Sequence, residues 1–197
     1  MLEDDFTWVL RKALKGLALS PGEAASRAGL PEKEVLAFSR GAFSAATARA
    51  IAPVLGLDPD AFALHDHYHP APLDLPEIQR LELPFGSERV NAWLIHSGND
   101  AILFDTGDDP HSCADALARL GVPRPGHVLI THAHGDHIGG ISPFLKQEIP
   151  VHGAEINRAK PLSPGETITA GRLTVRACDL SGHANPSLGY HVGGLAR

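Results

Sequence analysis

The sequence is poor in cysteine, in net positive charge and in long apolar runs, and each shortage excludes a class of protein. Its 197 residues include two cysteines, Cys113 and Cys178, and neither belongs to a CxxC pair. Two are too few for a disulfide framework, so we expect free, inert and at least partly buried thiols in a reducing cytoplasm. The formal net charge of −6 leaves no electrostatic footprint for nucleic acid or an anionic membrane.

No apolar run approaches the ~20 residues that span a bilayer. The first residues, Met1-Leu2-Glu3-Asp4-Asp5, are acidic where a secretory signal is basic. We therefore expect a cytoplasmic protein that does not enter a membrane. Hydrophobic residues at 43% and charged residues at 20% are typical of globular domains, and the length suits one or two of them.

Residues 1–65 are predicted to form a small all-α domain. Apolar residues recur at helical spacing from Phe6 to Leu17. Ser20 and Glu23 have the spacing of a capping box for a second helix, which ends at Gly29. A third helix is expected from Pro31 to about Gly41 and a fourth over residues 44–55. This order resembles the helix-turn-helix domains of the phage-repressor type.

The chemistry of DNA binding does not accompany this resemblance. A recognition helix needs basic or amide side chains, and the third helix here begins with the acidic segment Pro31–Glu34. Residues 1–65 hold seven Lys or Arg against eight Asp or Glu. We expect a dimerisation or packing module, with DNA binding as the alternative.

A proline-rich linker is predicted at residues 66–76, and the alternating histidines His65, His67 and His69 lie at its start. Alternate residues share a face in an extended chain and could bind a metal, but a solvated linker is the favoured interpretation.

From residue 77 the periodicity changes to that of strands, and we place a second domain over residues 77–197. Short apolar runs predict strands at 78–83, 90–96, 101–104, 127–131 and 150–152, and a hairpin over residues 166–177. Helices are expected from Asp108 to Leu120 and from about Asp136. This order indicates a layered α/β sandwich.

The most informative stretch is Thr131–Gly140, which places three histidines and a carboxylate within six residues. His132 and His134 are two apart, so in an extended segment both imidazoles project to the same side. Asp136 can begin a helix as its N-cap, with His137 in the first turn, and the glycine pair that follows allows close backbone approach. Imidazole and carboxylate are zinc ligands, and we favour a metal site over a turn of solvated histidines.

Read with the segments on both sides, this stretch resembles the metallo-β-lactamase superfamily. Upstream, Asn91–Ile95 and Ile102–Gly107 are similar to the family's early strands and its Asp-Thr-Gly turn. Downstream, Leu180–Tyr190 is similar to its Gly-His loop. The three motifs follow the family's order, and the resemblance covers roughly residues 76–197. It implies an αββα sandwich, so the predicted fold class is α/β preceded by a small all-α domain.

The resemblance also implies a set of metal ligands. Carried over to this sequence, His132, His134 and His183 hold one ion, and Asp136 with His137 helps to hold a second. Zinc is the expected metal, with two ions, and iron or manganese is the alternative. Asp136 would also orient the attacking metal-bound hydroxide or carry a proton, which makes it the expected catalytic residue.

Other polar residues are expected around these ligands. The resemblance places Asp105 beside the site, where it fixes a histidine tautomer or the loop. For the remaining histidines of this domain we favour surface, capping or packing roles over metal binding. They are His96, His111, His127, His152 and His191.

By resemblance to the glyoxalase II and lactonase branches, we expect a metal-dependent hydrolase of a small ester, thioester or lactone. An iron-dependent persulfide dioxygenase and a DNA-binding regulator with a metal-sensing domain are the alternatives.

Members of the family continue past the third histidine to a bridging carboxylate and a last histidine, which no residue after His183 can supply. We therefore expect the C-terminal part of the sandwich to be absent from this chain. A C-terminal remainder, a second polypeptide or a homodimer would then complete the fold by pairing with exposed apolar strands.

Overall fold

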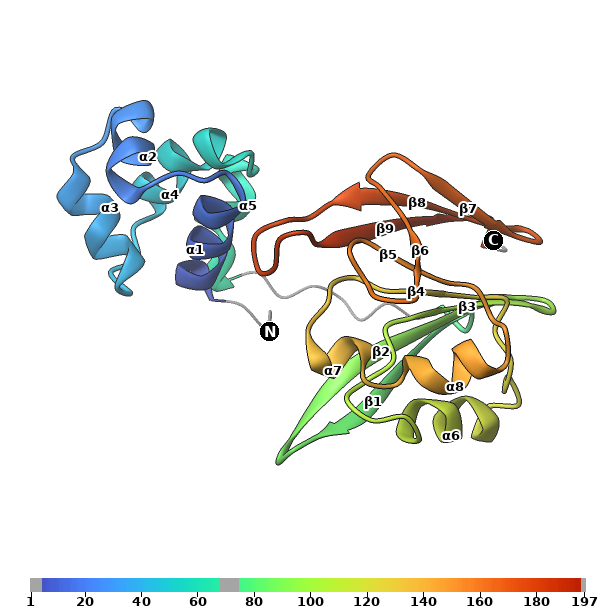
Figure 1. Ribbon diagram of the computed structural model, residues 1–197. Helices are drawn as coiled ribbons and strands as arrows, with labels where there is room; N and C mark the ends of the chain where they lie inside the picture. Colours follow the sequence, from blue (N-terminus) through green and yellow to red (C-terminus); the bar gives the residue numbers. More distant parts are fainter. Residues whose placement is uncertain (1–4, 68–74, 196–197) are drawn as a thin grey trace. The chain divides into compact units, whose positions relative to one another are not determined.

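The computed structural model describes residues 5–67 and 75–195, which fall in two compact units, Met1–Leu73 and Asp74–Arg197. Figure 1 shows helices alone in the first unit and two sheets with helices in the second. Most of the predicted linker, including His69, lies outside the described residues. Among the described residues, no helix combines the length and the apolarity needed to cross a bilayer.

The helices of the first unit begin and end where local signals place them. The hydroxyl of Ser20 accepts from the Glu23 backbone N–H, and the Glu23 carboxylate accepts from Ser20, which completes the predicted capping box. Gly29 ends that helix in the left-handed conformation that glycine adopts without strain. The α-helices are α1 (Phe6–Gly16), α2 (Pro21–Ala28), α3 (Glu32–Ser39), α4 (Ala45–Ile51) and α5 (Pro59–Ala63).

The fourth predicted helix is shorter than expected. Helix α4 ends at Ile51, and the chain continues as a 3-10 turn, η1 (Ala52–Leu55), that contains Pro53. Proline lacks the backbone N–H that an α-helix needs at this point. A second 3-10 turn, η2 (His65–His67), replaces the extended conformation considered for the alternating histidines.

Aromatic rings fill the core of the first unit. The ring of Phe38 lies 4.7 Å from that of Phe6 and 5.7 Å from that of Phe62, both edge-on, and Phe6 meets Phe43 in the same way at 5.0 Å. Such pairs stabilise a core beyond the burial of their area. The unit thus has a hydrophobic core of its own.

The second unit is built on a six-stranded sheet in which neighbours along the chain are neighbours in space. The first three strands are antiparallel and the last three join in parallel. The short β6 was not predicted, because two residues carry no periodic signal. The strands are β1 (Ile78–Phe85), β2 (Glu88–Ser97), β3 (Asp100–Phe104), β4 (His127–Leu129), β5 (Val151–Gly153) and β6 (Lys160–Pro161).

The two faces of this sheet are covered differently. Helices α6 (Ser112–Arg119) and α8 (Ile141–Lys146) lie on one face (Figure 1), where Leu117 and Phe144 are fully buried. A three-stranded antiparallel sheet packs against the other face. It consists of β7 (Thr167–Ala170), β8 (Leu173–Asp179) and β9 (Leu188–Gly193). The second unit is therefore the mixed α/β fold that was predicted, layered helix, sheet and sheet.

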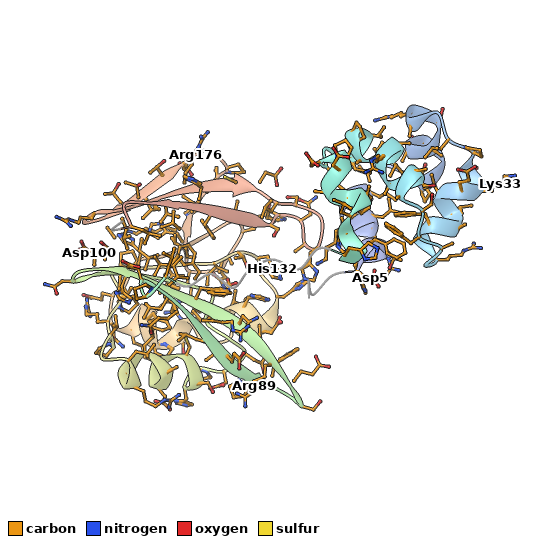
Figure 2. All side chains as sticks on the ribbon, turned by 180° about the vertical axis from the view of Figure 1, so that it is seen from behind. Asp5, Lys33, Arg89, Asp100, His132 and Arg176 are labelled. Atoms are coloured by element: carbon orange, nitrogen blue, oxygen red, sulfur yellow. The ribbon has the colours of Figure 1, made fainter. Side chains whose placement is uncertain are left out.

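The outward face of the three-stranded sheet corrects one expectation, the burial of Cys178. Along β8 the buried residues alternate with Thr174, Arg176 and Cys178, which are exposed. Arg176 points away from the layers in Figure 2. The exposed side chains of this strand are mainly polar, whereas Phe85 on β1 and Trp93 on β2 are exposed apolar side chains of the other sheet. Cys178 is exposed, although partial burial was expected for both cysteines, because it falls on the outward side of the alternation.

Cys113 is buried in α6, and burial raises the pKa of its thiol to about 12. A thiol with such a pKa stays protonated and unreactive at neutral pH.

Replacing Ser20 with Ala should destabilise the first unit by about 1 kcal/mol, because a backbone donor at the start of α2 loses its cap. Urea unfolding followed by Trp8 fluorescence in a Trp93→Phe background measures this unit, since Trp8 and Trp93 are the only tryptophans. In the control variant Ser39→Ala, only an intrahelical bond to the Leu36 carbonyl is lost, and the midpoint should hardly move. Equal midpoints for Ser20→Ala and the parent would contradict the role of the cap.

Candidate metal centre

His132 and His134 lie in the segment that connects β4 to the short helix α7 (Gly135–Ile138). The strand that delivers them is buried, and the Ile130 backbone N–H donates to the carbonyl of His152 on the neighbouring strand. Helix α7 begins at Gly135, and His134 occupies the N-cap position predicted for Asp136, with no side-chain capping bond. Asp136 therefore lies within the first turn and its carboxylate is available for other contacts.

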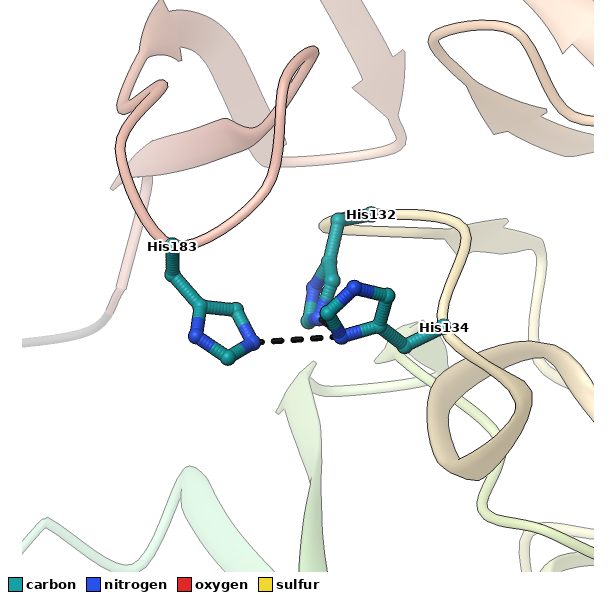
Figure 3. Close-up of side chains that lie close together, drawn as sticks. All are labelled: His132, His134 and His183. Atoms are coloured by element: carbon teal, nitrogen blue, oxygen red, sulfur yellow. Dashed lines mark hydrogen bonds between the residues drawn. The ribbon is translucent and has the colours of Figure 1, made fainter. Parts of the chain in front are cut away.

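His183 joins this pair from the other sheet, on the loop between β8 and β9 (Figure 3). Nδ1 of His134 lies 3.1 Å from Nε2 of His132 and 3.2 Å from Nε2 of His183. One ring nitrogen from each residue falls within 4.8 Å of the others. Among the described residues this is the only group of three or more metal-ligating side chains that converge so closely.

A buried carboxylate organises the floor of the centre. Asp105 follows β3 in the left-handed region at φ 59°, which costs a non-glycine residue about 1 kcal/mol or more. Its Oδ1 accepts from the Thr131 backbone N–H (2.8 Å), and its Oδ2 accepts from the Thr131 hydroxyl (2.8 Å) and from Nδ1 of His137 (2.8 Å). These bonds hold the segment after β4 against the end of β3.

The hydroxyl of Thr131 links Asp105 to His132 and fixes the tautomer of that ring. Because a carboxylate only accepts, the hydroxyl donates to Asp105 and can then accept from Nδ1–H of His132, at 2.9 Å. The proton on Nδ1 leaves a lone pair on Nε2, the atom that faces the other two histidines. Burial, with the nearby His137, lowers the pKa of His132 to about 4, so the ring is neutral at pH 7.

The ring of His137 packs against that of His132, with 4.2 Å between their centroids, but His137 is not one of the three converging ligands. Burial alone would lower the pKa of His137, but the hydrogen bond to Asp105 and the charges of Asp105 and Asp136 raise it above the usual value. With Nδ1 committed to Asp105, its Nε2 lies 3.5 Å from Oδ2 of Asp136. Asp136 and His137 thus form a pair of their own beside the three histidines.

Two glycines allow the surrounding loops to approach closely. A Cβ atom on Gly139 would lie 1.9 Å from the Asp108 carbonyl oxygen, and one on Gly140 would lie 2.2 Å from that of Thr106. No other residue fits at such distances. The buried Thr106 uses its backbone N–H and its hydroxyl to donate to the His137 carbonyl, each at 2.9 Å. The close approach predicted for the glycine pair is therefore present.

The other histidines of this unit lie apart from the centre. His127 at the start of β4 places Nδ1 3.2 Å from Nε2 of His152, and burial lowers the pKa of both rings, that of His152 to about 4. They share the inner face of β4 and β5 with Leu129, so they pack between the sheets. His96 is half-buried on β2, and His111 and His191 are exposed.

Sequence reasoning missed Thr106, Thr131 and Tyr190 as contributors to the centre. The hydroxyl of Tyr190 on β9 donates to the Ile130 carbonyl at 2.6 Å. The signal in the sequence was their place in the motif segments, with the two threonines beside Asp105 and His132 and Tyr190 at the end of the Gly-His segment.

Replacing Asp105 with Asn should reverse the tautomer of His137 in the metal-free protein. The amide would donate where the carboxylate accepted, so Nδ1 must accept and the proton moves to Nε2. Nitrogen NMR of the histidine rings at pH 8 distinguishes the two forms. The exposed Asp108 supplies the control, because Asp108→Asn should leave the His137 signals unchanged. Persistence of the Nδ1–H form in Asp105→Asn would show that Asp105 does not set the tautomer.

Comparison with known proteins places this geometry in a family. The family model "Metallo-beta-lactamase superfamily" matches residues 86–192, more than half of the chain. The probable metallo-hydrolase YybB of Bacillus subtilis is 40% identical over 63 residues, 32% of this chain and 29% of that protein. The hydroxyacylglutathione hydrolase of Cupriavidus metallidurans is 32% identical over 117 residues, 52% of this chain and 43% of that protein.

An atrochrysone carboxyl ACP thioesterase of Aspergillus terreus is 29% identical over 110 residues, 51% of this chain and 34% of that protein. The match thus spans less than half the length of each of these relatives.

Solved structures agree in fold. MEM-A1, a subclass B3 metallo-beta-lactamase from a soil metagenome library, superposes with a TM-score of 0.50 at 20% identity, covering 61% of this chain and 56% of that chain. A B3 metallo-beta-lactamase with an active-site glutamic acid gives 0.51 at 20% identity, covering 64% and 59%. At such low identity these structures support the fold alone, and the family assignment rests on the match to the family model. The chain belongs to the metallo-beta-lactamase superfamily.

Proposed function

We propose that this chain carries the metal-binding half of a hydrolase that cleaves a small ester, thioester or lactone. The observation that carries the proposal is the convergence of three imidazole nitrogens, on His132, His134 and His183, in a member of this family. Zinc is the metal that we propose, since neutral imidazoles suit it well, and iron or manganese would fit the same donors.

The donors fit such an ion. Nitrogen ligands at about 2.0–2.1 Å from a tetrahedral zinc ion lie about 3.3–3.4 Å from one another. The nitrogen–nitrogen distances of 3.1 and 3.2 Å from Nδ1 of His134 to the other two rings are close to that value. The lone pair on Nε2 of His132 is set in advance by Thr131, so this ligand needs no change of tautomer. Three protein ligands leave a fourth position for water or substrate, as in catalytic zinc sites.

A divalent ion held by these residues would act as a Lewis acid, which polarises a carbonyl and lowers the pKa of water towards about 7. The chain's own residues have separate tasks. Asp105 and Thr131 hold the histidine tautomers, and Asp136, which is partly exposed, offers Oδ2 as the acceptor of a proton from the attacking water.

A second ion would be held by Asp136 and His137. Nε2 of His137 and Oδ2 of Asp136 lie 3.5 Å apart, and the bond of Nδ1 to Asp105 leaves the Nε2 lone pair for a metal. Among the described residues, no third metal-ligating side chain converges with Asp136 and His137. We propose that the remaining ligands come from a C-terminal remainder or a second polypeptide, with a homodimer as one form of it.

For the substrate we propose a thioester first. One relative is named as a hydroxyacylglutathione hydrolase and another as an ACP thioesterase, and acyl groups on glutathione or on an acyl carrier protein are thioesters. Esters and lactones present the same electrophilic carbonyl, so they remain the second choice. No observation on the site favours persulfide oxidation over hydrolysis.

Removing one ligand should strongly weaken metal binding and, with it, hydrolysis. We expect His132→Ala and His183→Ala to weaken zinc binding by more than about 100-fold, since losing even an outer partner of a ligand costs 10–100-fold. Competition with a chromophoric chelator measures the affinity, and hydrolysis of an acylglutathione measures the activity. His111→Ala is the matched control, because His111 is exposed and lies outside the centre. Unchanged zinc affinity in both ligand variants would refute the proposed function.

The first unit we propose to be an interaction module that packs or dimerises through its helices. Its third helix, α3, begins with Glu32 and Glu34 in the first turn, beside Lys33. A carboxylate there repels the phosphates that a helix in this place would approach. The alternative of a DNA-binding regulator lacks this electrostatic support.

The two roles differ in their dependence on salt. We expect the full chain to show no binding to a duplex DNA library at 50 mM salt, and no salt-dependent affinity, in fluorescence anisotropy. The double variant Glu32→Lys with Glu34→Lys removes the acidic turn and serves as the comparison. Tight, salt-sensitive binding by the unaltered chain would favour the regulator instead.

A further inference from the structure

The three histidines come from two different sheets, so their geometry depends on how these sheets meet. His132 and His134 follow β4 of the six-stranded sheet, and His183 precedes β9 of the three-stranded sheet. His183 is exposed, so burial of its ring does not fix its position. The loop that carries His183 and the strand on which that loop stands therefore contribute to its position.

The loop itself is compact. The Leu180 backbone N–H donates to the Ser187 carbonyl at 2.9 Å, which closes the base of the loop where β8 ends and β9 begins. Inside it, the Ser181 N–H donates to Oδ1 of Asp179 at 2.9 Å and the Gly182 N–H donates to the Ala184 carbonyl at 3.0 Å. A loop bonded in this way moves with its base, so the docking of β9 decides where His183 points.

Two hydrogen bonds dock β9 onto the segment that leads to His132. The Leu188 backbone N–H donates to the Thr131 carbonyl at 2.7 Å, and the Tyr190 hydroxyl donates to the Ile130 carbonyl at 2.6 Å. The two acceptors are consecutive carbonyls, immediately before His132. The ring of Tyr190 also packs against Phe104 at 5.3 Å, next to Asp105.

Tyr190 is the side chain in this contact that mutation can alter without breaking the backbone. Burial raises the pKa of its phenol well above the usual value, so the hydroxyl keeps its proton and stays a donor at any physiological pH. The Leu188 bond alone allows β9 to pivot about one point. The Tyr190 bond supplies the second point, which fixes the angle between the two ligand-bearing segments.

We infer that Tyr190 is a positioning residue for the metal centre: its hydroxyl, through the Ile130 carbonyl, holds the His183 loop at the distance from His132 and His134 that one metal ion requires. The inference rests on the proposed metal site and adds a residue that touches neither metal nor substrate. Outer partners of metal ligands typically contribute 10–100-fold to affinity.

The test compares Tyr190→Phe with a variant that loosens the same two sheets elsewhere. Asp100 is the first residue of β3, and its carboxylate accepts from the Arg172 backbone N–H in the β7–β8 turn at 3.1 Å. Figure 2 shows Asp100 and His132 at opposite ends of the second unit. Asp100→Ala therefore removes a hydrogen bond between the sheets without touching the histidine end.

We expect Tyr190→Phe to weaken Zn²⁺ binding about tenfold in chelator competition and to alter the visible spectrum of bound Co²⁺, which reports ligand geometry. Asp100→Ala should stay within about twofold of the parent in affinity, with the parent's Co²⁺ spectrum. Circular dichroism confirms that each variant is folded before metal is added.

Two results would overturn the inference. One is parental affinity and spectrum in Tyr190→Phe; the other is an equal loss in both variants, which would mark a general effect of loosened sheets. His183→Ala separates this inference from the proposed function. If His183→Ala weakens Zn²⁺ binding and Tyr190→Phe does not, only the role of Tyr190 fails. If neither does, the metal site itself is wrong.

Discussion

The carboxylate of Asp105 is buried at the end of β3, and a buried charge is tolerated only where it is paired and hydrogen-bonded. Thr131 and His137 satisfy it, and in doing so they tie the segment after β4 and the helix α7 to the end of β3. The left-handed backbone of Asp105 is strained, and these bonds offset the strain. The tautomers of two histidines follow from this one group, because each proton must point to an acceptor.

The geometry of the centre also depends on close packing of the backbone around it. The Asp-Thr-Gly turn and the glycine pair after α7 touch through their main chains, at distances where any side chain would collide. Thr106 bridges the two loops with both of its donors. The polar groups of these buried loops are therefore satisfied by one another, which makes a rigid support for side chains that have to converge on one point.

The centre also lies where the two sheets meet. One sheet supplies the His-x-His segment and the other supplies His183, and the apolar cluster between them includes Phe104, Leu129 and Leu188. Hydrophobic burial is not directional, so it brings the sheets together without setting their angle. Directional hydrogen bonds set the angle. Leu188 and Tyr190 form such bonds at the histidine end, and Asp100 forms one at the other end.

The sequence by itself determined the features that depend on residues close together in the chain. The capping box of Ser20 and Glu23, the hairpin over residues 166–177 and the apolar strands were predicted, because each needs contacts only a few residues away. The family resemblance added the α/β fold. The spacing of His132 and His134 likewise indicated that their side chains could meet.

Tertiary structure decided the rest. It made His134 the N-cap of α7 in place of Asp136, exposed Cys178, and paired His127 with His152. It also joined Tyr190 to Ile130 across 60 residues and His183 to His134 across 49. Local periodicity holds no information about such distant contacts. They arise when two sheets dock, because burying the apolar faces brings polar groups from different strands within reach of one another and leaves them to pair.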